Sequence, residues 1–206
     1  MYIKNILSIF VENLSIMANI PLTENERRAW DFSKEKHKLQ IRKFLNIPYF
    51  DAHVQKVNGI VKMYTQNEII LIASILHDVL EDCFKNKWEG YSVIRDMFGE
   101  LVADLVMELT TDKDIIKYKY NGSKKDYLSN KMINMSDDAL IIKLADRLQN
   151  ISDAFTADES FRIKYVNETF YILDRIESAR QLNKIQKVLF LDIKMKLENI
   201  KKIFGM

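Results

Sequence analysis

The sequence predicts an all-α protein, a single helical bundle of about nine to eleven helices. The chain of 206 residues contains only five glycines and two prolines, so it offers few positions for the tight turns that hairpin-rich sheets need. Apolar residues make up 48% of the chain, which is enough for one well-filled core. These residues recur at helical spacing between capping residues, which favours helices throughout.

Charge and cysteine content limit the class of protein. The formal net charge of +2 gives no strong attraction to nucleic acid, and Cys83 as the single cysteine excludes an internal disulfide. A reducing cytoplasm is therefore the expected location. Without linkers or repeats, we expect one domain over residues 1–206. Its motif-bearing core covers about 30–156, and helices at 1–20 and 158–203 pack on it.

The first twenty residues predict an amphipathic helix that docks on the domain. Glu12 and Asn13 interrupt the apolar run, and no small-residue cleavage site follows, so neither a membrane span nor a signal peptide is indicated. Binding of this face to a membrane surface or a partner is the alternative. Its apolar residues are Ile3, Ile6, Leu7, Phe10, Val11, Leu14 and Met17.

Caps and breaks divide the rest of the chain. Thr23 and Glu26 form a capping box, Pro48 interrupts the pattern, and Asn67 and Ser136 can cap later helices. The lysine-rich segment 111–126 contains an Asn-Gly pair and predicts a mobile surface loop. The apolar stripe of the last helix either completes the core or forms a dimer seam. The expected helices cover 23–44, 51–64, 68–82, 91–98, 100–110, 137–155, 158–180 and 182–203.

The stretch LIASILHDVLEDC, residues 71–83, carries ionisable residues at the end of a buried run. Burying such groups costs several kcal/mol unless something compensates. On a helix, residues four apart share a face, which places His77 over Glu81 and Asp78 over Asp82. Carboxylates that lie close together repel one another. A metal ion between His77 and Asp78 would offset this repulsion, because the carboxylates would then act as ligands of the cation.

A second buried helix repeats this anomaly. Asp146 follows the run LIIKLA, and Asn150 lies one turn later on the same face. Imidazole combined with carboxylate suits Mn, Fe, Co, Ni or Zn better than Ca or Mg. Each signal alone also fits an ordinary ion pair in a core.

Five motifs in order carry a resemblance to a known family. They are H-x-x-Q-x-R-K (37–43), PYFDAH (48–53), HDVLED (77–82), FGELVADLVMELT (98–110) and KLADRLQN (143–150). In this order they resemble the HD-domain hydrolases of the RelA/SpoT family, which degrade the alarmone (p)ppGpp. The resemblance covers residues 30–156 and implies an all-α fold.

The resemblance also implies the functional residues. One Mn²⁺ ion per chain is expected on His53, His77, Asp78 and Asp146. Glu81 and Asp82 match the acidic pair that positions and activates the attacking water. Positions that contact the nucleotide are matched by Arg42, Lys43, Tyr49 and Asn150. Arg42 is placed to stack on guanine, and Asn150 lies near the ribose. His37 and Cys83 are expected to be structural.

The implied reaction removes the 3′-diphosphate of (p)ppGpp to give GDP or GTP and pyrophosphate. The expected partner is this small-molecule nucleotide, with no nucleic acid or membrane, and the oligomeric state stays open. The alternatives are an HD phosphohydrolase for another phosphorylated nucleotide, such as NADPH, and a catalytically silent module that binds nucleotide or protein. Five lysines near the expected loop either screen the charge of the substrate or stay solvated: Lys113, Lys117, Lys119, Lys124 and Lys125.

Two segments depart from the family pattern. His53 lies four residues after Tyr49, one more than is usual, and Val54 replaces a proline. We expect the extra residue to shift the pocket without removing the ligand. Gln149 and Ser152 stand where relatives often carry an aromatic residue or histidine and an arginine, which removes one contact for a phosphate or base.

Overall fold

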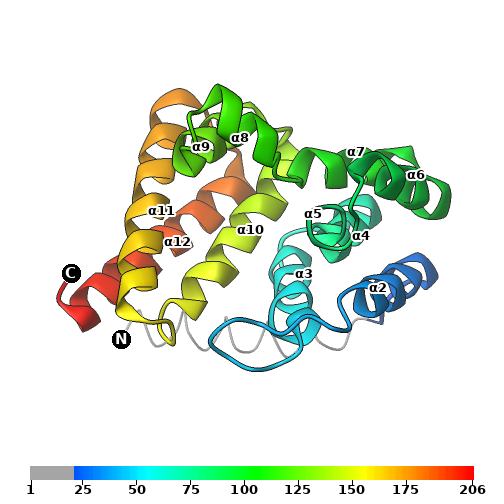
Figure 1. The fold of residues 1–206 in the computed structure, drawn as a ribbon, viewed down its shortest axis with the longest axis horizontal. Helices are drawn as coiled ribbons and strands as arrows, with labels where there is room; N and C mark the ends of the chain where they lie inside the picture. The colour runs from blue at the N-terminus through cyan, green and yellow to red at the C-terminus, as the bar shows by residue number, and fades with distance from the viewer. Residues whose placement is uncertain (1–20) are drawn as a thin grey trace.

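A computed structural model of the chain describes residues 21–206, which fold into helices joined by short connections (Figure 1). The all-α prediction is confirmed for this part of the chain; the helix expected at 1–20 lies outside it. No helix within 21–206 is long and apolar enough to cross a bilayer. The elements are α2 (Glu24–Lys36), η1 (Phe50–Val54), α3 (Gln55–Lys62), α4 (Glu68–Leu76), α5 (Val79–Asp82), α6 (Lys87–Phe98), α7 (Glu100–Leu109), α8 (Lys113–Lys119), α9 (Lys124–Asn134), α10 (Asp137–Asp153), α11 (Glu159–Ala179) and α12 (Lys184–Phe204).

Helix α10 runs through the middle of the molecule and packs against α12 on one side and α3 on the other (Figure 1). The Ser136 side chain accepts a hydrogen bond from the Ala139 amide and caps this helix, as its sequence predicts. Most of α10 is buried, including its ionisable residues Lys143, Asp146 and Arg147. Charged side chains inside a core require opposite charges or bound ligands as partners. The residues that face this side of α10 are therefore candidates for a functional site.

The prediction of a mobile loop over 111–126 is wrong, because this segment forms α8 and the start of α9. The Asp112 carboxylate accepts hydrogen bonds from the Asp114 and Ile115 amides and caps α8. Asn121 and Gly122 adopt positive φ angles of 49° and 81° and form the turn between the two helices. The Asn-Gly signal therefore marked a tight turn between helices.

Two other helices are shorter than expected. Helix α2 ends at Lys36, and the chain then turns through positive φ angles at Phe44 and Asn46 before it reaches η1. The helix expected over 68–82 is interrupted at His77 and Asp78 and continues as α5. This interruption places two consecutive side chains in the functional site.

Candidate metal centre and active site

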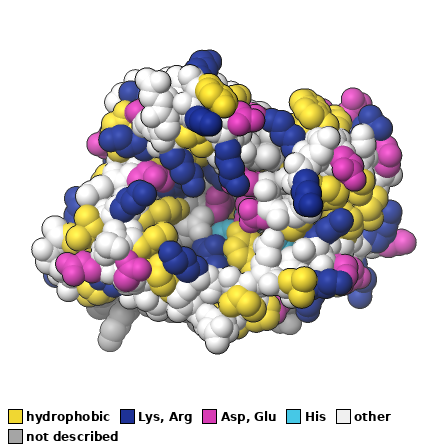
Figure 2. All heavy atoms as spheres, in the orientation of Figure 1, with side chains coloured by type: hydrophobic (Ala, Val, Ile, Leu, Met, Phe, Trp, Pro, Cys, Tyr) yellow, Lys and Arg dark blue, Asp and Glu magenta, His cyan; other side chains and the backbone are white. Residues whose placement is uncertain are grey.

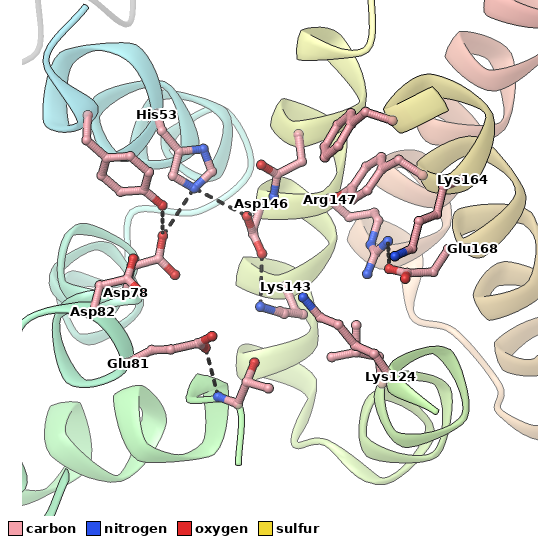
Figure 3. Close-up of a pocket in the computed structure, with 16 residues that line it drawn as sticks. His53, Asp78, Glu81, Asp82, Lys124, Lys143, Asp146, Arg147, Lys164 and Glu168 are labelled. Atoms are coloured by element: carbon pink, nitrogen blue, oxygen red, sulfur yellow. Dashed lines mark hydrogen bonds and ion pairs between the residues drawn. The ribbon is translucent and has the colours of Figure 1, made fainter. Parts of the chain in front are cut away.

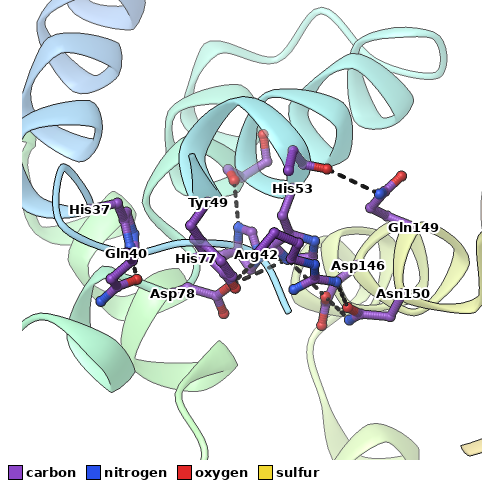
Figure 4. Close-up of polar contacts among 12 residues, drawn as sticks. His37, Gln40, Arg42, Tyr49, His53, His77, Asp78, Asp146, Gln149 and Asn150 are labelled. Carbon is purple, nitrogen blue, oxygen red and sulfur yellow. Dashed lines mark hydrogen bonds and ion pairs between the residues drawn. The ribbon is translucent and has the colours of Figure 1, made fainter. Parts of the chain in front are cut away.

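Four side chains converge on one point between η1, α4 and α10 (Figure 4). His53 Nε2 lies 3.2 Å from His77 Nε2, 3.3 Å from Asp78 Oδ2 and 3.3 Å from Asp146 Oδ1. His77 Nε2 lies 3.0 Å from Asp78 Oδ2. The two rings are buried, and the structure thus brings together all four residues that the sequence suggested as metal ligands.

The interruption between α4 and α5 explains how neighbours in sequence can share a site. His77 Nδ1 donates to the Ser74 carbonyl at 2.8 Å, and Asp78 adopts φ −101° and ψ −5°, outside the geometry of a regular helix. On an unbroken helix these side chains would diverge by about 100°. Because the helix breaks, both reach the same point, and in the neutral His77 ring the Nδ1 donor leaves Nε2 with its lone pair free.

His53 lies in η1, a single π-helical turn over Phe50–Val54, which is the segment where the sequence comparison by motif predicted one extra residue. A π turn inserts one residue into a helix and is common at functional sites. The chain therefore continues into α3 in register, and His53 still points at His77. The Gln149 side chain, the second departure from the family pattern, donates from Nε2 to the Ala52 carbonyl of this turn at 3.2 Å (Figure 4). The two segments that depart from the family pattern are therefore in direct contact, through the hydrogen bond from Gln149 to Ala52.

Gln149→Leu is expected to loosen the π turn, because it removes a buried donor to the Ala52 carbonyl. The free energy of unfolding should fall by about 1–2 kcal/mol. Metal affinity should fall about tenfold, as it does when a group that orients a ligand is lost. Denaturant unfolding and metal titration measure the two effects. Gln66→Leu is the control, because exposed Gln66 also donates to a backbone carbonyl, that of Lys62 at the same 3.2 Å, and does not line the cavity. Unchanged metal affinity in Gln149→Leu would contradict this role.

The geometry of the cluster fits a divalent metal ion. Donor atoms about 2.1 Å from an ion lie about 3.0 Å apart at a right angle and about 3.4 Å apart at the tetrahedral angle. The measured separations of 3.0 to 3.3 Å lie within this range. Ligand atoms of His53, His77 and Asp146 all lie within 4.8 Å of one another. Four acceptor atoms facing one another repel unless a cation or protons lie between them, so the donor set fits the ion.

Neighbouring groups fix the two carboxylates. Lys143 Nζ lies 2.9 Å from Asp146 Oδ2, and Asn150 Nδ2 donates to Asp146 Oδ1 at 2.5 Å. Tyr49 donates its hydroxyl to Asp78 Oδ2 at 2.5 Å. Burial alone would raise the pKa of Asp146, but Lys143 and His53 outweigh it and hold this pKa well below its usual range. The aspartates are thus ionised and oriented, as metal ligands must be.

The acidic pair lies beside the cluster, on one wall of a cavity of about 370 Å³ (Figure 3). Glu81 and Asp82 both line this cavity together with Asp78 and Asp146. Glu81 Oε2 accepts a hydrogen bond from the Thr111 amide at 2.9 Å, which fixes its orientation. Burial, followed by the charges of Asp78 and Glu81, raises the pKa of Asp82 to about 6. A carboxylate with this pKa accepts a proton more readily than an aspartate of ordinary pKa does.

The four residues expected to contact the nucleotide occupy different positions. Tyr49 and Asn150 line the cavity. Arg42 pairs through Nε with Asp153 at 2.7 Å, donates through Nη2 to Asn150, and lies 5.4 Å from the centre of the Tyr49 ring. Arg42 and Lys43 both lie outside the cavity lining. The Lys43 ammonium lies 4.8 Å from the Phe44 ring centre and 5.5 Å from that of Phe161, which lines the cavity. The structure therefore brings Arg42, Tyr49 and Asn150 together and places Lys43 at one side.

Most of the opposite wall of the cavity was not expected from the sequence. This wall is basic and carries Lys124 from α9, Lys143 and Arg147 from α10 and Lys164 from α11. Of the five lysines named near the expected loop, only Lys124 lines the cavity. Figure 2 shows a hollow on this face, with basic side chains along its rim and acidic and histidine side chains inside. In α10, the spacing of Lys143, Asp146, Arg147 and Asn150 was a readable signal, since it forms one polar face in a buried helix.

Helix α11 supplies the remaining residues of this wall, at positions three and four apart. Phe161 and Tyr165 stack at 5.6 Å between ring centres, and Arg147 lies 5.1 Å from the centre of the Tyr165 ring. Glu168 accepts a hydrogen bond from Arg147 at 3.3 Å. No motif marked these residues, because the face that α11 turns to the cavity is set by its packing against α9.

His37 and Cys83 lie outside the cavity lining. His37 Nδ1 lies 2.7 Å from Gln40 Oε1, and its ring packs 5.1 Å from that of Tyr49. Burial raises the pKa of Cys83 to about 12, so its thiol stays protonated and unreactive at neutral pH. Both positions agree with the structural roles expected from the sequence.

Comparison with known proteins gives the family. A model of the HD domain matches residues 29–181. A guanosine-3′,5′-bis(diphosphate) 3′-pyrophosphohydrolase of Aquifex aeolicus is 33% identical over 151 residues, 72% of this chain and 20% of the relative. A protein of the same name from Spiroplasma citri is 29% identical over 127 residues, 61% of this chain and 16% of the relative. The chain spans a fifth or less of the length of these curated relatives.

A solved structure gives the same result at the level of the fold. It is described as a metazoan ortholog of SpoT that hydrolyses ppGpp, and it superposes with a TM-score of 0.69 at 25% identity. The superposition covers 90% of this chain and 98% of the other, so the two folds correspond over nearly their whole lengths. Membership of an HD hydrolase family implies a divalent metal ion, for which His53, His77 and Asp146 form the candidate cluster. The resemblance read from five short motifs is confirmed: this chain belongs to the HD-domain family.

Proposed function

We propose that this protein is a Mn²⁺-dependent hydrolase that removes the 3′-diphosphate of (p)ppGpp and releases GDP or GTP and pyrophosphate. The observation that carries the proposal is one cavity with a His–Asp cluster, an acidic pair beside it and a basic wall opposite. The similarity to named ppGpp 3′-pyrophosphohydrolases supports this substrate. We also propose that residues 1–206 form one hydrolase domain that works in the cytoplasm.

His53, His77, Asp78 and Asp146 would hold the metal ion, for which imidazole with carboxylate is a suitable donor set. When bound, the ion supplies Lewis-acid chemistry that polarises the 3′-diphosphate and acidifies a water molecule. Tyr49 and Asn150 keep two of these carboxylates in place through hydrogen bonds. The protein itself contributes a fixed, largely dehydrated set of charges.

Glu81 and Asp82 position the attacking water and take its proton. Glu81 is held by the Thr111 amide, so its second oxygen is available to a water molecule in the cavity. Asp82 has a raised pKa of about 6, which suits the proton acceptor that general-base catalysis needs. Lys143 and Arg147 line the cavity beside the cluster and face the negative charge that develops on the 3′-diphosphate.

The nucleoside fits at the end of the cavity near Arg42, Tyr49 and Asn150. The planar Arg42 guanidinium already lies over the Tyr49 ring, and it can stack on a base in the same way. Its ion pair with Asp153 fixes the orientation of this plane. Asn150 links Arg42 to Asp146 and so couples the nucleoside end to the metal cluster.

The test is pyrophosphate release from ppGpp by the chain purified with added Mn²⁺, with metal content measured in the same sample. Release that depends on Mn²⁺ and is absent after chelation supports the proposal. NADPH serves as the competing substrate, and Mg²⁺, Zn²⁺ and Co²⁺ as competing ions. A chain that holds one ion and hydrolyses NADPH but not ppGpp would keep the metal centre and overturn the guanine assignment. A chain without metal or turnover would be a silent module.

The pH profile of the reaction should show an acidic limb. Asp82 is raised to a pKa of about 6, so below this pH it becomes protonated and can no longer accept a proton. A bound cation lowers that pKa, so kcat should fall as the pH drops through about 6 or slightly below. The Asp82→Asn variant should lose this limb together with most of its activity. A wild-type profile that stays flat from pH 7 to pH 5 would exclude Asp82 as the base.

A further inference from the structure

A second hollow continues from the cavity and lies between the start of α9 and the middle of α11. We call it the α9–α11 groove. It shares Lys124, Lys164 and Glu168 with the cavity, so the two hollows form one continuous surface. Its volume is about 400 Å³. Figure 3 shows the Lys124 and Lys164 side chains extending from α9 and α11 into the adjoining cavity. The residues that line only the groove are Gly122, Ser123, Lys125 and Asn167.

The groove carries positive charge that its surroundings do not neutralise. Within residues 21–206, the Lys124 and Lys164 side chains have no hydrogen-bond or ion-pair partner, and Lys125 lies over the Tyr171 ring at 4.6 Å. Glu168 is the only acidic residue of the described groove lining, and it is already paired with Arg147. Three ammonium groups are thus available to an anion that enters from the cavity.

We propose that the α9–α11 groove binds the 5′-phosphate chain of the nucleotide and makes the enzyme sensitive to the length of that chain. This inference rests on the proposed function, because that substrate carries phosphates at both ends of the nucleoside. The 3′ end occupies the metal cluster, and the 5′ end needs cations of its own. Lys124 and Lys164 stand at the junction with the cavity, and Lys125 lines only the groove. Each added 5′-phosphate extends the chain toward Lys125.

The test compares guanosine 3′-diphosphates that carry one, two or three 5′-phosphates as substrates. Lys125→Met should lower kcat/KM about fivefold for the 5′-triphosphate form, mainly through KM, and less than twofold for the 5′-monophosphate form. Lys117→Met is the matched control: it removes the same charge and a similar contact, since Lys117 lies 4.9 Å from the Tyr118 ring centre, but it lines neither hollow. It should change the three values by one small common factor. The selectivity in Lys125→Met should also weaken as the salt concentration rises.

Equal losses for all three substrates in Lys125→Met, or the same length dependence in Lys117→Met, would overturn the inference. Failure of the proposed function looks different, because the wild type then hydrolyses none of the three. In that case binding of inorganic tripolyphosphate decides the matter. Weaker binding by Lys125→Met than by Lys117→Met would support an anion groove, and equal binding would exclude it.

Discussion

Asp78→Ala is expected to abolish both metal binding and hydrolysis. Asp78 Oδ2 lies 3.0 Å from His77 Nε2 and 3.3 Å from His53 Nε2, so its carboxylate supplies one of four converging donors. Its removal takes away one negative charge and one of the four candidate ligands, which leaves only three protein donors for the ion. Metal content should fall from one ion per chain to a small fraction of that. Pyrophosphate release should fall at least about 1,000-fold, because the chemistry that the ion supplies disappears with it.

Controls separate loss of the metal from loss of the fold. Asp78→Asn keeps the shape of the side chain and an oxygen that accepts from Tyr49, so it should fold normally and still lose most of its metal. Asp96→Ala removes an exposed aspartate of α6 and should change activity less than twofold. Atomic absorption and thermal unfolding of the same samples give both readouts. An Asp78→Asn protein that keeps one ion per chain and full activity would contradict the ligand assignment.

Part of the candidate metal centre could be predicted from the sequence because its signals are local, whereas His53 and the acidic pair were implied only by the family resemblance. His77 and Asp78 stand out at the end of an apolar run, and Asp146 stands out inside α10. Charged residues in such positions need a compensating partner wherever the chain folds, so the order of the residues alone reveals the anomaly. The starts of α2, α4 and α10 were also predictable, because a capping side chain bonds an amide only two or three residues further along the chain.

The opposite wall was not predictable in this way because its residues come together only through tertiary packing. Lys164 and Glu168 lie on a helix whose polar residues would be ordinary on any solvated surface. Lys124 stood in a segment that was mistaken for a loop, since lysines and an Asn-Gly pair indicate a turn but not the helices on either side of it. The π turn shows the same limit. The extra residue was visible in the sequence, but the turn is held by tertiary contacts such as the hydrogen bond from Gln149 to the Ala52 carbonyl, which the sequence does not show.

Glu81→Gln is expected to separate chemistry from metal binding. The glutamine oxygen can still accept the hydrogen bond from the Thr111 amide, so the side chain keeps its position and loses only its charge and basicity. Metal content should stay near that of the wild type. Hydrolysis should fall by about 100- to 10,000-fold, the range that a positioned general base contributes.

The matched control for this variant is Glu108→Gln. Glu108 also accepts a hydrogen bond from a backbone amide, that of Ser136 at 2.7 Å, but it does not line the cavity. It should keep activity within about twofold, because a neutral acceptor satisfies the same amide. Activity that survives in Glu81→Gln and disappears in Asp82→Asn would assign proton transfer to Asp82 alone, with Glu81 holding Thr111. Loss of metal in Glu81→Gln would instead show that Glu81 is a metal ligand. That result would contradict its assignment to the acidic pair that activates water.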